Sequence, residues 1–459
     1  MYPLGTANRT LRVAIIGSGP TGFYTADHLF KSNLSVEVCI FEQWPVPFGL
    51  IRFGVAPDKQ NTKQVTRLFE RIARDQRFRF YGNVHIGRDL TVQELGQYFD
   101  ALVFTHGAES HRRLNVPGED LPGSYSANEF VGWYNGHPEY RDLNPDLSRE
   151  AAVVVGNGNV AMDVARMLVR HPDDLAKTDI SPYALETLQR NTIRTVYVVG
   201  RRGPAQAAFT HPELLELDAG SECQAVVEAA ELELNRISEN ELTTPGAGKR
   251  QHVMQVLQDF ASASAARKAR RRVSFKFQRS PVAIEGDERV EGVRFEHNAL
   301  TGDAGAQRAE GTGILERIDC GLVVRCIGYR GTAIDGLPFD EGRGVVPNAA
   351  GRIVDGPRVL PGLYAAGWIK HGPVGLIATG KKDVASVVAE IHHDVLSLQP
   401  CPTPDTAAME ELLAERAIPV VNFDGWKRID DAEIARGKSA GKPREKFTTV
   451  DDMLAAAGL

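Results

Sequence analysis

The sequence predicts an α/β protein with two parallel sheets, in which a second α/β unit is inserted into a discontinuous first unit. Three observations predict this fold. Two β-branched, strand-like runs, residues 13–16 and 153–155, each lead into a glycine turn. Strand-like and helix-like patterns alternate from residue 11 to about 105, and a second such unit follows. Finally, the strand-like run 362–368 resembles a strand that returns to the first unit.

The first glycine turn, residues 17–22, reads Gly-Ser-Gly-Pro-Thr-Gly. Glycines at this spacing allow a tight turn and a close approach of the backbone to a pyrophosphate, and the helix N-terminus that follows attracts the anion. The next strand-like run, residues 36–41, ends at Glu42. An acid at this place can bind a ribose hydroxyl pair. The strand, turn, helix and acid together indicate a Rossmann-like dinucleotide-binding domain, and the alternative is a chance glycine turn.

The second glycine turn, residues 156–161, reads Gly-Asn-Gly-Asn-Val-Ala and has the same setting. Its partner strand, residues 195–200, contains no acid and runs into Arg201 and Arg202. A guanidinium pair there offers forked donors to a 2′-phosphate, whereas an acid would accept from a 2′-hydroxyl. Two solvated surface arginines are the alternative interpretation. We therefore expect FAD at the first turn, through Glu42, and NADPH at the second.

Three further segments set the expected domain boundaries. Residues 101–108 and 322–329 are strand-like runs that end on glycine, and a helical excursion at 171–190 separates the second fingerprint from its arginines. We expect a FAD-binding domain at 1–106 and 331–459, with an NADP-binding domain at 107–330 inserted into it.

The composition is that of an ordinary globular protein. The chain has 459 residues and a formal net charge of −6, which argues against a general nucleic-acid binder. No apolar run approaches the length of a membrane span, and the residues before the first strand are too few for a targeting peptide. These features predict a cytoplasmic protein, although a processed organellar protein would look the same.

The five cysteines are scattered along the chain, and no Cys-x-x-Cys pair occurs. This excludes the dithiol of disulfide-reducing flavoenzymes and the familiar iron–sulfur spacings. No metal site is predicted. An iron–sulfur cluster that receives electrons would therefore belong to a partner.

Several long strings resemble the adrenodoxin reductase family, the ferredoxin–NADP reductases of mitochondrial and actinobacterial type. The resemblance covers nearly the whole chain. Its strings are residues 47–58, 80–84, 130–136, 200–204, 209–210, 366–370 and 441–446. Glutamate synthase small subunits share the two fingerprints but usually have Asp where this chain has Trp368.

The fingerprints and the resemblance together give the expected cofactor-binding residues. For FAD they are Gly17, Gly19, Pro20, Thr21, Glu42, Leu50, Val84, Trp368, Gly375, Leu376 and Ile377. For NADP they are Asn157, Gly158, Asn159, Val160, Arg201, Arg202, Glu213 and Gly375. A helix is expected to begin at Gly375, where its amides could stabilise negative charge on reduced flavin.

The sequence departs from the family pattern in three places. Lys59-Gln60 stands where the family usually has His-Pro, His371 replaces an Arg, and Val374 replaces a Thr. The first departure removes a histidine that could relay protons and leaves that task to polar groups such as Asp163 and Glu216. The second makes a fixed cation titratable. The third removes a hydroxyl near the flavin.

The resemblance implies that NADPH passes hydride to FAD, which then releases electrons singly to a ferredoxin-type iron–sulfur protein. Hydride transfer needs no acid or base from the protein. Asp163 is the best candidate for substrate orientation or proton balance, with a helix-surface Asp as the alternative. A basic run at 261–272 is either a solvated face or a docking surface for an acidic partner. Two other functions stay open: an electron-input subunit of a fixed complex, and a non-enzymatic NADP-binding redox sensor.

Overall fold

The structure is a computed structural model that describes residues 3–217, 223–263, 269–375 and 380–459. The chain divides into two compact units. Unit 1 combines residues 1–111 with residues 329–459, and unit 2 comprises residues 112–328. None of the helices in these described ranges has the length and apolar character needed to cross a lipid bilayer.

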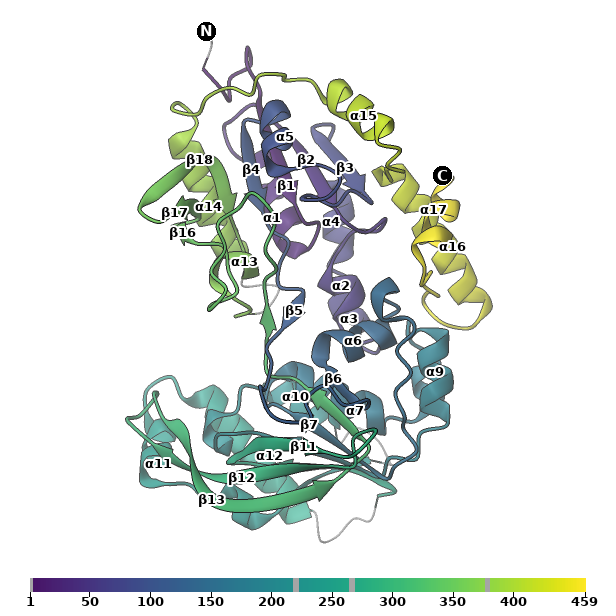
Figure 1. Cartoon of the computed structure of the whole chain (residues 1–459), viewed down its shortest axis with the longest axis vertical. Coiled ribbons are helices and arrows are strands. Elements are labelled where there is room, and N and C mark those ends of the chain that lie inside the picture. Colours follow the sequence, from purple (N-terminus) through teal and green to yellow (C-terminus); the bar gives the residue numbers. More distant parts are fainter. Residues whose placement is uncertain (1–2, 218–222, 264–268, 376–379) are drawn as a thin grey trace. The chain divides into compact units, whose positions relative to one another are not determined.

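In the part of unit 1 that the structure describes, seven strands form one sheet in the order β16-β17-β18-β4-β1-β2-β3 (Figure 1). The strands from β18 to β3 run parallel, whereas β16 and β17 add an antiparallel edge. The strand bounds are β1 Leu11–Ile16, β2 Val36–Glu42, β3 Phe78–Gly82, β4 Ala101–Phe104, β16 Asn348–Ala349, β17 Arg352–Asp355 and β18 Arg358–Ala365.

Helices cover both faces of this sheet. Val13 and Ile15 of β1 belong to one apolar core, and Ala14 and Ile16 belong to the other. A strand buried on both faces is typical of a parallel sheet. The helices are α1 Pro20–Phe30, α2 Leu50–Phe53, α3 Gln60–Lys63, α4 Thr66–Ile72, α5 Val92–Tyr98, α13 Trp368–His371, α14 Gly380–Asp394, α15 Thr406–Glu415, α16 Phe423–Ser439 and α17 Val450–Ala457.

Unit 2 contains a parallel sheet in the order β6-β14-β7-β8-β10-β9 and an antiparallel sheet in the order β11-β12-β13. The strands of the parallel sheet are β6 Ser124–Ser126, β7 Ala151–Val155, β8 Thr195–Val199, β9 Cys223–Val227, β10 Arg271–Lys276 and β14 Leu322–Arg325. The antiparallel strands are β11 Arg279–Glu285, β12 Gly292–Thr301 and β13 Arg308–Asp319. The sequence patterns did not predict this antiparallel sheet.

The α-helices of unit 2 are α6 Ala127–Asn135, α7 Asn159–Val169, α8 Pro172–Leu175, α9 Pro182–Gln189, α10 His211–Leu217, α11 Arg236–Thr243 and α12 Gly248–Ala263. Short 3-10 turns lie at η1 Pro138–Tyr140, η2 Pro204–Gln206 and η3 Ala229–Leu232. The predicted helical excursion is therefore two helices, α8 and α9. Strands β5 (Ser110–His111) and β15 (Tyr329–Arg330) pair where the chain leaves and re-enters unit 1.

The predicted fold class is confirmed. The strand expected to return to unit 1 is β18, which pairs parallel to β4 beside β1. The insertion of unit 2 between β4 and β18 makes unit 1 discontinuous, as the run 362–368 indicated.

Candidate nucleotide sites

The first glycine turn joins β1 to α1, and its glycines are required by close backbone contacts. A Cβ on Gly17, whose φ is +104°, would lie 2.7 Å from the Cα of His106. A Cβ on Gly22 would lie 2.2 Å from the carbonyl oxygen of Gly17. Gly19 caps the helix and Pro20 is its first residue, with open space around Gly19. The turn therefore packs tightly against the sheet and keeps its middle open, as a pyrophosphate requires.

Glu42 ends β2 beside this turn and is buried, with 7% of its surface exposed. One carboxylate oxygen accepts hydrogen bonds from Ser18 N (3.1 Å) and Ser18 Oγ (2.6 Å), and the other accepts from Trp44 N (3.2 Å). Burial raises the pKa of Glu42, and the hydrogen bonds from Ser18 and Trp44 act in the opposite direction. A carboxylate can accept about four hydrogen bonds, so these three leave it able to accept about one more, from a ribose hydroxyl.

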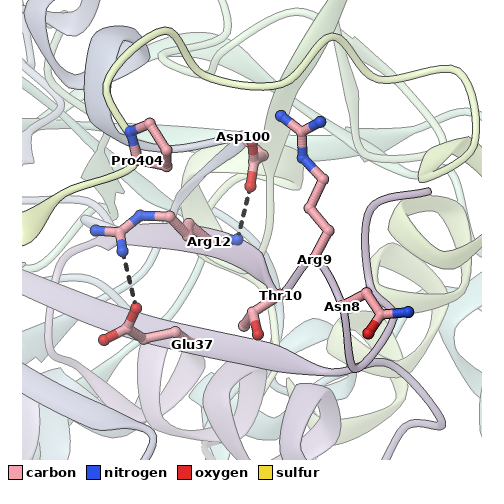
Figure 2. Close-up of a pocket in the computed structure, with 7 residues that line it drawn as sticks. All are labelled: Asn8, Arg9, Thr10, Arg12, Glu37, Asp100 and Pro404. Atoms are coloured by element: carbon pink, nitrogen blue, oxygen red, sulfur yellow. Dashed lines mark hydrogen bonds and ion pairs between the residues drawn. The ribbon is translucent and has the colours of Figure 1, made fainter. Parts of the chain in front are cut away.

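A polar hollow of about 470 Å³ lies at the other end of β1, lined by Asn8, Arg9, Thr10, Arg12, Glu37, Asp100 and Pro404 (Figure 2). Within it, the Arg12 guanidinium pairs with Glu37 at 2.9 Å, and Arg12 N donates to Asp100. Dinucleotides bind at the carboxyl ends of parallel strands. This hollow is at the amino end and therefore is not the nucleotide site.

The other residues expected to bind FAD in unit 1 gather around the carboxyl ends of its strands. Val84 is buried, and its N–H donates to the carbonyl of Glu42 at 2.9 Å. A Cβ on Gly367, whose φ is +72°, would lie 2.5 Å from Thr21 Oγ1, so the start of α13 lies against the start of α1. Trp368 begins α13, is half-buried and stacks on Tyr329 with the ring centroids 5.8 Å apart.

Gly375 follows α13 and is exposed, with a φ of +95°. That backbone conformation is not helical, and the described part of α14 begins at Gly380. Leu376 and Ile377 lie outside the described residues.

The second glycine turn, in unit 2, repeats the tight packing of the first. A Cβ on Gly156, whose φ is +139°, would lie 2.2 Å from the carbonyl oxygen of Cys326, while Gly158 has open space around it. A Cβ on Gly200 would lie 1.7 Å from Asn157 Nδ2, so the Asn157 side chain fills the space that Gly200 leaves. Asn159 Oδ1 accepts from Thr210 N at 2.9 Å, which ties the start of α7 to the segment after the arginines.

Arg201 and Arg202 follow β8 and are both exposed. Their carbonyl groups are fixed, because Arg201 O accepts from Asn298 Nδ2 (2.9 Å) and Arg202 O accepts from Gln278 N (3.1 Å). In the described part of the chain, neither guanidinium forms an ion pair. The arginines thus have an anchored backbone and charged ends directed to solvent, an arrangement suited to an anionic ligand.

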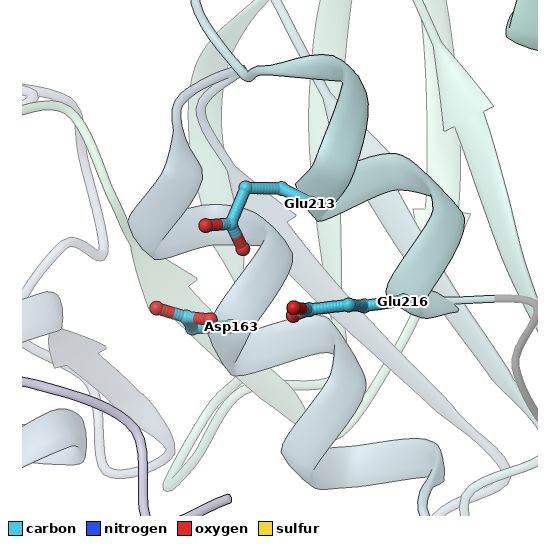
Figure 3. A group of neighbouring side chains, drawn as sticks. All are labelled: Asp163, Glu213 and Glu216. Atoms are coloured by element: carbon cyan, nitrogen blue, oxygen red, sulfur yellow. The ribbon is translucent and has the colours of Figure 1, made fainter. Parts of the chain in front are cut away.

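Asp163, on α7, lies with Glu213 and Glu216 of α10 in a group whose carboxylate oxygens are all within 4.8 Å of one another (Figure 3). Arg166, whose side chain is 3% exposed, pairs with all three at 2.7 Å, 3.8 Å and 3.1 Å respectively. The Asp163 side chain is 13% exposed and is therefore not a solvent-facing residue of the helix surface. The central guanidinium offsets part of the negative charge and fixes the direction of each carboxylate.

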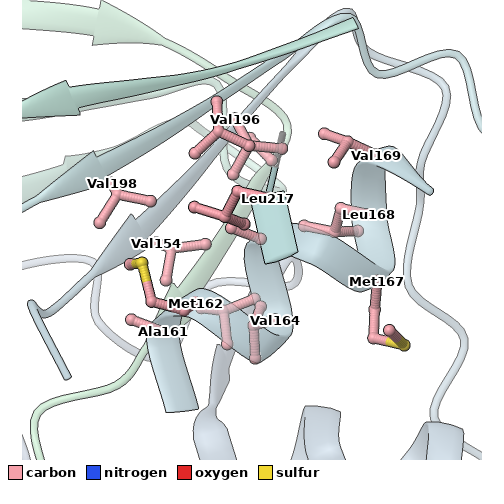
Figure 4. Packing of buried hydrophobic residues seen from close by; sticks show 14 of the residues in the cluster. Val154, Ala161, Met162, Val164, Met167, Leu168, Val169, Val196, Val198 and Leu217 are labelled. Carbon is pink, nitrogen blue, oxygen red and sulfur yellow. The ribbon is translucent and has the colours of Figure 1, made fainter. Parts of the chain in front are cut away.

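Helix α7 holds Asp163 because its other face is packed into the core of unit 2. Met162, Val164 and Leu168 of this helix are buried with Val154 and Val196 of the sheet (Figure 4). Buried residues thus cover most of the circumference of α7, and the half-buried Asn159, Val160 and Asp163 share the remaining strip. Val160 packs at the edge of the same core.

Proteins of known family resemble this chain along nearly its whole length. A family profile described as pyridine nucleotide-disulphide oxidoreductase matches residues 11–199. The mitochondrial NADPH:adrenodoxin oxidoreductase of Bos taurus is 43% identical over 99% of this chain and 93% of its own length. A probable ferredoxin/ferredoxin–NADP reductase of Mycobacterium leprae is 44% identical over 98% of this chain and 78% of its own length. The chain belongs to the adrenodoxin reductase family.

A solved structure supports the same membership. FprA of Mycobacterium tuberculosis in complex with NADPH superposes with a TM-score of 0.91 at 40% identity, covering 98% of this chain and 100% of that chain. The family resemblance drawn from the motif strings is therefore confirmed, and it extends to both units.

The three departures from the family pattern all lie in unit 1. Lys59 is half-buried and precedes α3. His371 ends α13, with Nε2 3.8 Å from Asp383. Asp383 also pairs with Lys370 (2.6 Å) and accepts from Gly367 N (2.7 Å), so the segment that carries Trp368 is fixed by this one carboxylate. Val374 is 72% exposed.

The basic run at 261–272 is only partly a free surface. Arg267 and Lys268 lie outside the described residues. Arg271 and Arg272 belong to β10 and not to a helix or loop, and Arg271 donates to the carbonyls of Arg170 and Asn191. Arg270 and Arg272 are exposed. The proposed docking surface therefore loses Arg271, because that side chain ties β10 to neighbouring segments.

Sequence reasoning missed two residues of the first site. The motif assigns no role to Ser18, yet its hydroxyl orients Glu42. His106 lies against Gly17, and its Nε2 is 3.2 Å from the carbonyl of Thr332. Its position directly after a strand at the carboxyl edge of the sheet was a signal that could have identified it.

Proposed function

We propose that the protein is an NADPH-dependent flavoenzyme that reduces a ferredoxin-type iron–sulfur protein. The observation that carries this proposal is the difference between the two partner strands: β2 ends in a buried acid, Glu42, and β8 ends in two exposed arginines. An acid selects a free ribose, and arginines select a 2′-phosphate. The names of the relatives, an adrenodoxin oxidoreductase and a ferredoxin–NADP reductase, support the same assignment.

In this proposal unit 1 is the FAD-binding domain and unit 2 the NADP-binding domain. The residues present fit both groups, because each turn is open at its middle glycine, Gly19 or Gly158, and each strand end carries the matching polar groups. Gly17, Gly19, Pro20, Thr21, Glu42, Leu50, Val84 and Trp368 would hold FAD. Asn157, Gly158, Asn159, Val160, Arg201, Arg202 and Glu213 would hold NADP. Gly375, Leu376 and Ile377 are proposed as further contacts.

FAD, when bound, accepts two electrons from NADPH and passes them on one at a time. The chain's own residues bind and orient the two nucleotides. Glu42 and the α1 amides would hold the adenosine and pyrophosphate, and Arg201 and Arg202 would hold the 2′-phosphate. Asp163, fixed by Arg166, would orient the nicotinamide end or balance a proton. Four of the cysteines are unsuited to redox chemistry, because burial raises the pKa of Cys39, Cys320, Cys326 and Cys401 and keeps each thiol protonated.

The decisive experiment is an anaerobic stopped-flow trace of the purified protein. NADPH should bleach the visible absorbance of the flavin, and an added ferredoxin should restore it. Protein that is not reduced by NADPH would favour a redox sensor. Protein that is reduced but transfers electrons only within a complex that co-purifies would favour an electron-input subunit. We also propose a cytoplasmic location, which fractionation of the source cells would test.

A further inference from the structure

The segment that precedes α2 lies directly on the first glycine turn. Phe48 N donates to the carbonyl oxygen of Ser18 at 3.1 Å. A Cβ on Gly49 would lie 3.2 Å from the Cα of Gly19. The turn's amides are the groups that bind a pyrophosphate, so the position of this segment sets the space available to one.

Phe48 is held in an unfavourable backbone conformation, with a φ of +86°. The next residue also has a positive φ, +47°, but it is Gly49, which adopts such angles readily. A bulky residue rarely adopts a positive φ, and it does so only where its surroundings hold it there. The Phe48 ring is buried, lying 5.4 Å from Phe23 and in a T-shaped contact 5.5 Å from Trp426. Trp426 belongs to α16, near the end of the chain, so a distant element restrains this backbone.

A buried ion pair makes a second link to the same helix. Arg52 of α2 donates to both oxygens of Glu433 of α16, Nη1 to Oε2 at 2.9 Å and Nη2 to Oε1 at 2.5 Å. Their side chains are 3% and 0% exposed. The following segment closes the arrangement, because Phe447 N donates to Glu433 at 2.9 Å and Lys446 Nζ donates to the carbonyl of Arg52 at 3.0 Å.

The buried pair of Arg52 and Glu433 contributes little to the stability of the fold and mainly fixes the positions of the helices that carry it. Burying two charges costs about as much as their attraction returns, so an apolar pair of similar size would stabilise the fold as well. A bidentate pair, however, fixes both the distance and the angle between its two elements. The arrangement of Arg52 and Glu433 therefore serves to set where α2 stands relative to α16.

We propose that Glu433 is a positioning residue for FAD. Through Arg52, and together with Trp426, it holds the strained segment 48–49 on the pyrophosphate turn. The C-terminal segment, including the string 441–446, thereby belongs to the flavin site although it is remote from it in sequence. This inference rests on the proposed function, since it assumes that FAD occupies unit 1.

The test compares Glu433→Gln with Glu37→Gln in the holoenzyme. Glu37 is a matched control, because it pairs with Arg12 at 2.9 Å in the same unit but at the amino end of β1. The FAD dissociation constant is measured from flavin fluorescence on dilution, with folding checked by circular dichroism. Each oxygen of Glu433 accepts two hydrogen bonds, because Arg444 Nη1 also donates to Oε2 at 3.2 Å, and the NH2 group of a glutamine cannot accept any of them. Glu433→Gln should therefore raise this constant about tenfold or more, and Glu37→Gln should leave it within about twofold. Arg52→Lys, which keeps the charge but loses the fork, should fall between them.

Unchanged FAD affinity in a folded Glu433→Gln variant would overturn the inference. Equal losses in Glu433→Gln and Glu37→Gln would also overturn it, because they would reflect general destabilisation. If Glu433→Gln does not fold, Arg52→Lys and Trp426→Phe test the proposal instead. Weakened FAD binding in either folded variant supports the proposal, and wild-type affinity in both overturns it. Wild-type protein that never binds FAD would instead overturn the proposed function on which the inference depends.

Discussion

Ser18 holds Glu42 in place with two hydrogen bonds to a single carboxylate oxygen, one from its backbone N–H at 3.1 Å and one from its hydroxyl at 2.6 Å. The glycine turn thus fixes the acid that stands beside it. Because both donors come from the turn, any movement of the turn would also move the carboxylate. The two parts of the proposed adenosine site are therefore a single rigid arrangement.

Replacing Glu42 with Ala should weaken FAD binding about 10- to 100-fold. The substitution removes the acceptor for a ribose hydroxyl, a charge-assisted bond that contributes about 1.5–3 kcal/mol, and it leaves Ser18 Oγ without its partner. The FAD dissociation constant measures the effect. Glu37→Ala, on the same strand, is the control and should bind FAD normally. A colourless, folded wild-type protein that cannot be reconstituted with FAD would contradict the assignment.

Replacing both Arg201 and Arg202 with Ala should raise the KM for NADPH and leave that for NADH nearly unchanged. The two guanidinium groups would contribute about 1.5–3 kcal/mol each to 2′-phosphate binding, or roughly two to four powers of ten together. Steady-state kinetics with both cofactors and a dye acceptor measures the difference. Arg190→Ala, an exposed arginine on the same unit, should change neither constant. Equal losses for NADPH and NADH would show that the arginines do not select the phosphate.

The stability of the apoprotein should fall between pH 6.5 and pH 4 because of His106. Burial lowers the pKa of this imidazole from 6.5 to about 4. Above pH 6.5 the imidazole of His106 is neutral in both the folded and the unfolded state. As the pH falls, the unfolded chain binds a proton that the folded chain does not, so the free energy of unfolding decreases, by at most about 3 kcal/mol.

Urea unfolding of His106→Gln at several pH values tests this effect. The variant should lose that part of the pH dependence, whereas His392→Gln, on the exposed face of α14, should retain it. An identical pH profile in wild type and His106→Gln would show that His106 titrates normally in the folded protein.

Lys59→His should lower the flavin midpoint potential and change the pH dependence of flavin reduction. A cation favours the reduced, anionic flavin, and at about 7 Å with an effective dielectric of about 20 it contributes about 2 kcal/mol. For a two-electron couple this is about 40 mV. The NADPH to NADH preference should stay fixed, because that choice lies with Arg201 and Arg202. Spectroelectrochemistry measures the potential, with Lys31→His, at the far end of α1, as the control. An unaltered potential and pH profile would mean that Lys59 does not act on the flavin.

The fold and both glycine turns could be predicted because their causes are local. A tight turn needs glycine where a Cβ would meet the backbone, as at Gly17 and Gly156, and a buried parallel strand needs a continuous apolar run. Glu42, Arg201 and Arg202 could be found for the same reason, because each lies at the end of such an apolar run. The antiparallel sheet of unit 2 was missed because β13 is mostly exposed, and an exposed strand has no apolar run to mark it.

The sequence by itself therefore determined the fold class, the two glycine turns and the polar residues that follow the strands. Tertiary structure alone decided which distant groups meet: Glu433 with Arg52, Arg166 with Glu213 and Glu216, and Arg271 with backbone carbonyls. Arg52 and Glu433 are 381 positions apart, so their ion pair leaves no local sequence pattern. The residues that flank each of them in the sequence do not distinguish it from a charged residue that faces solvent. Burial, which makes such a pair strong and specific, exists only once the elements have packed.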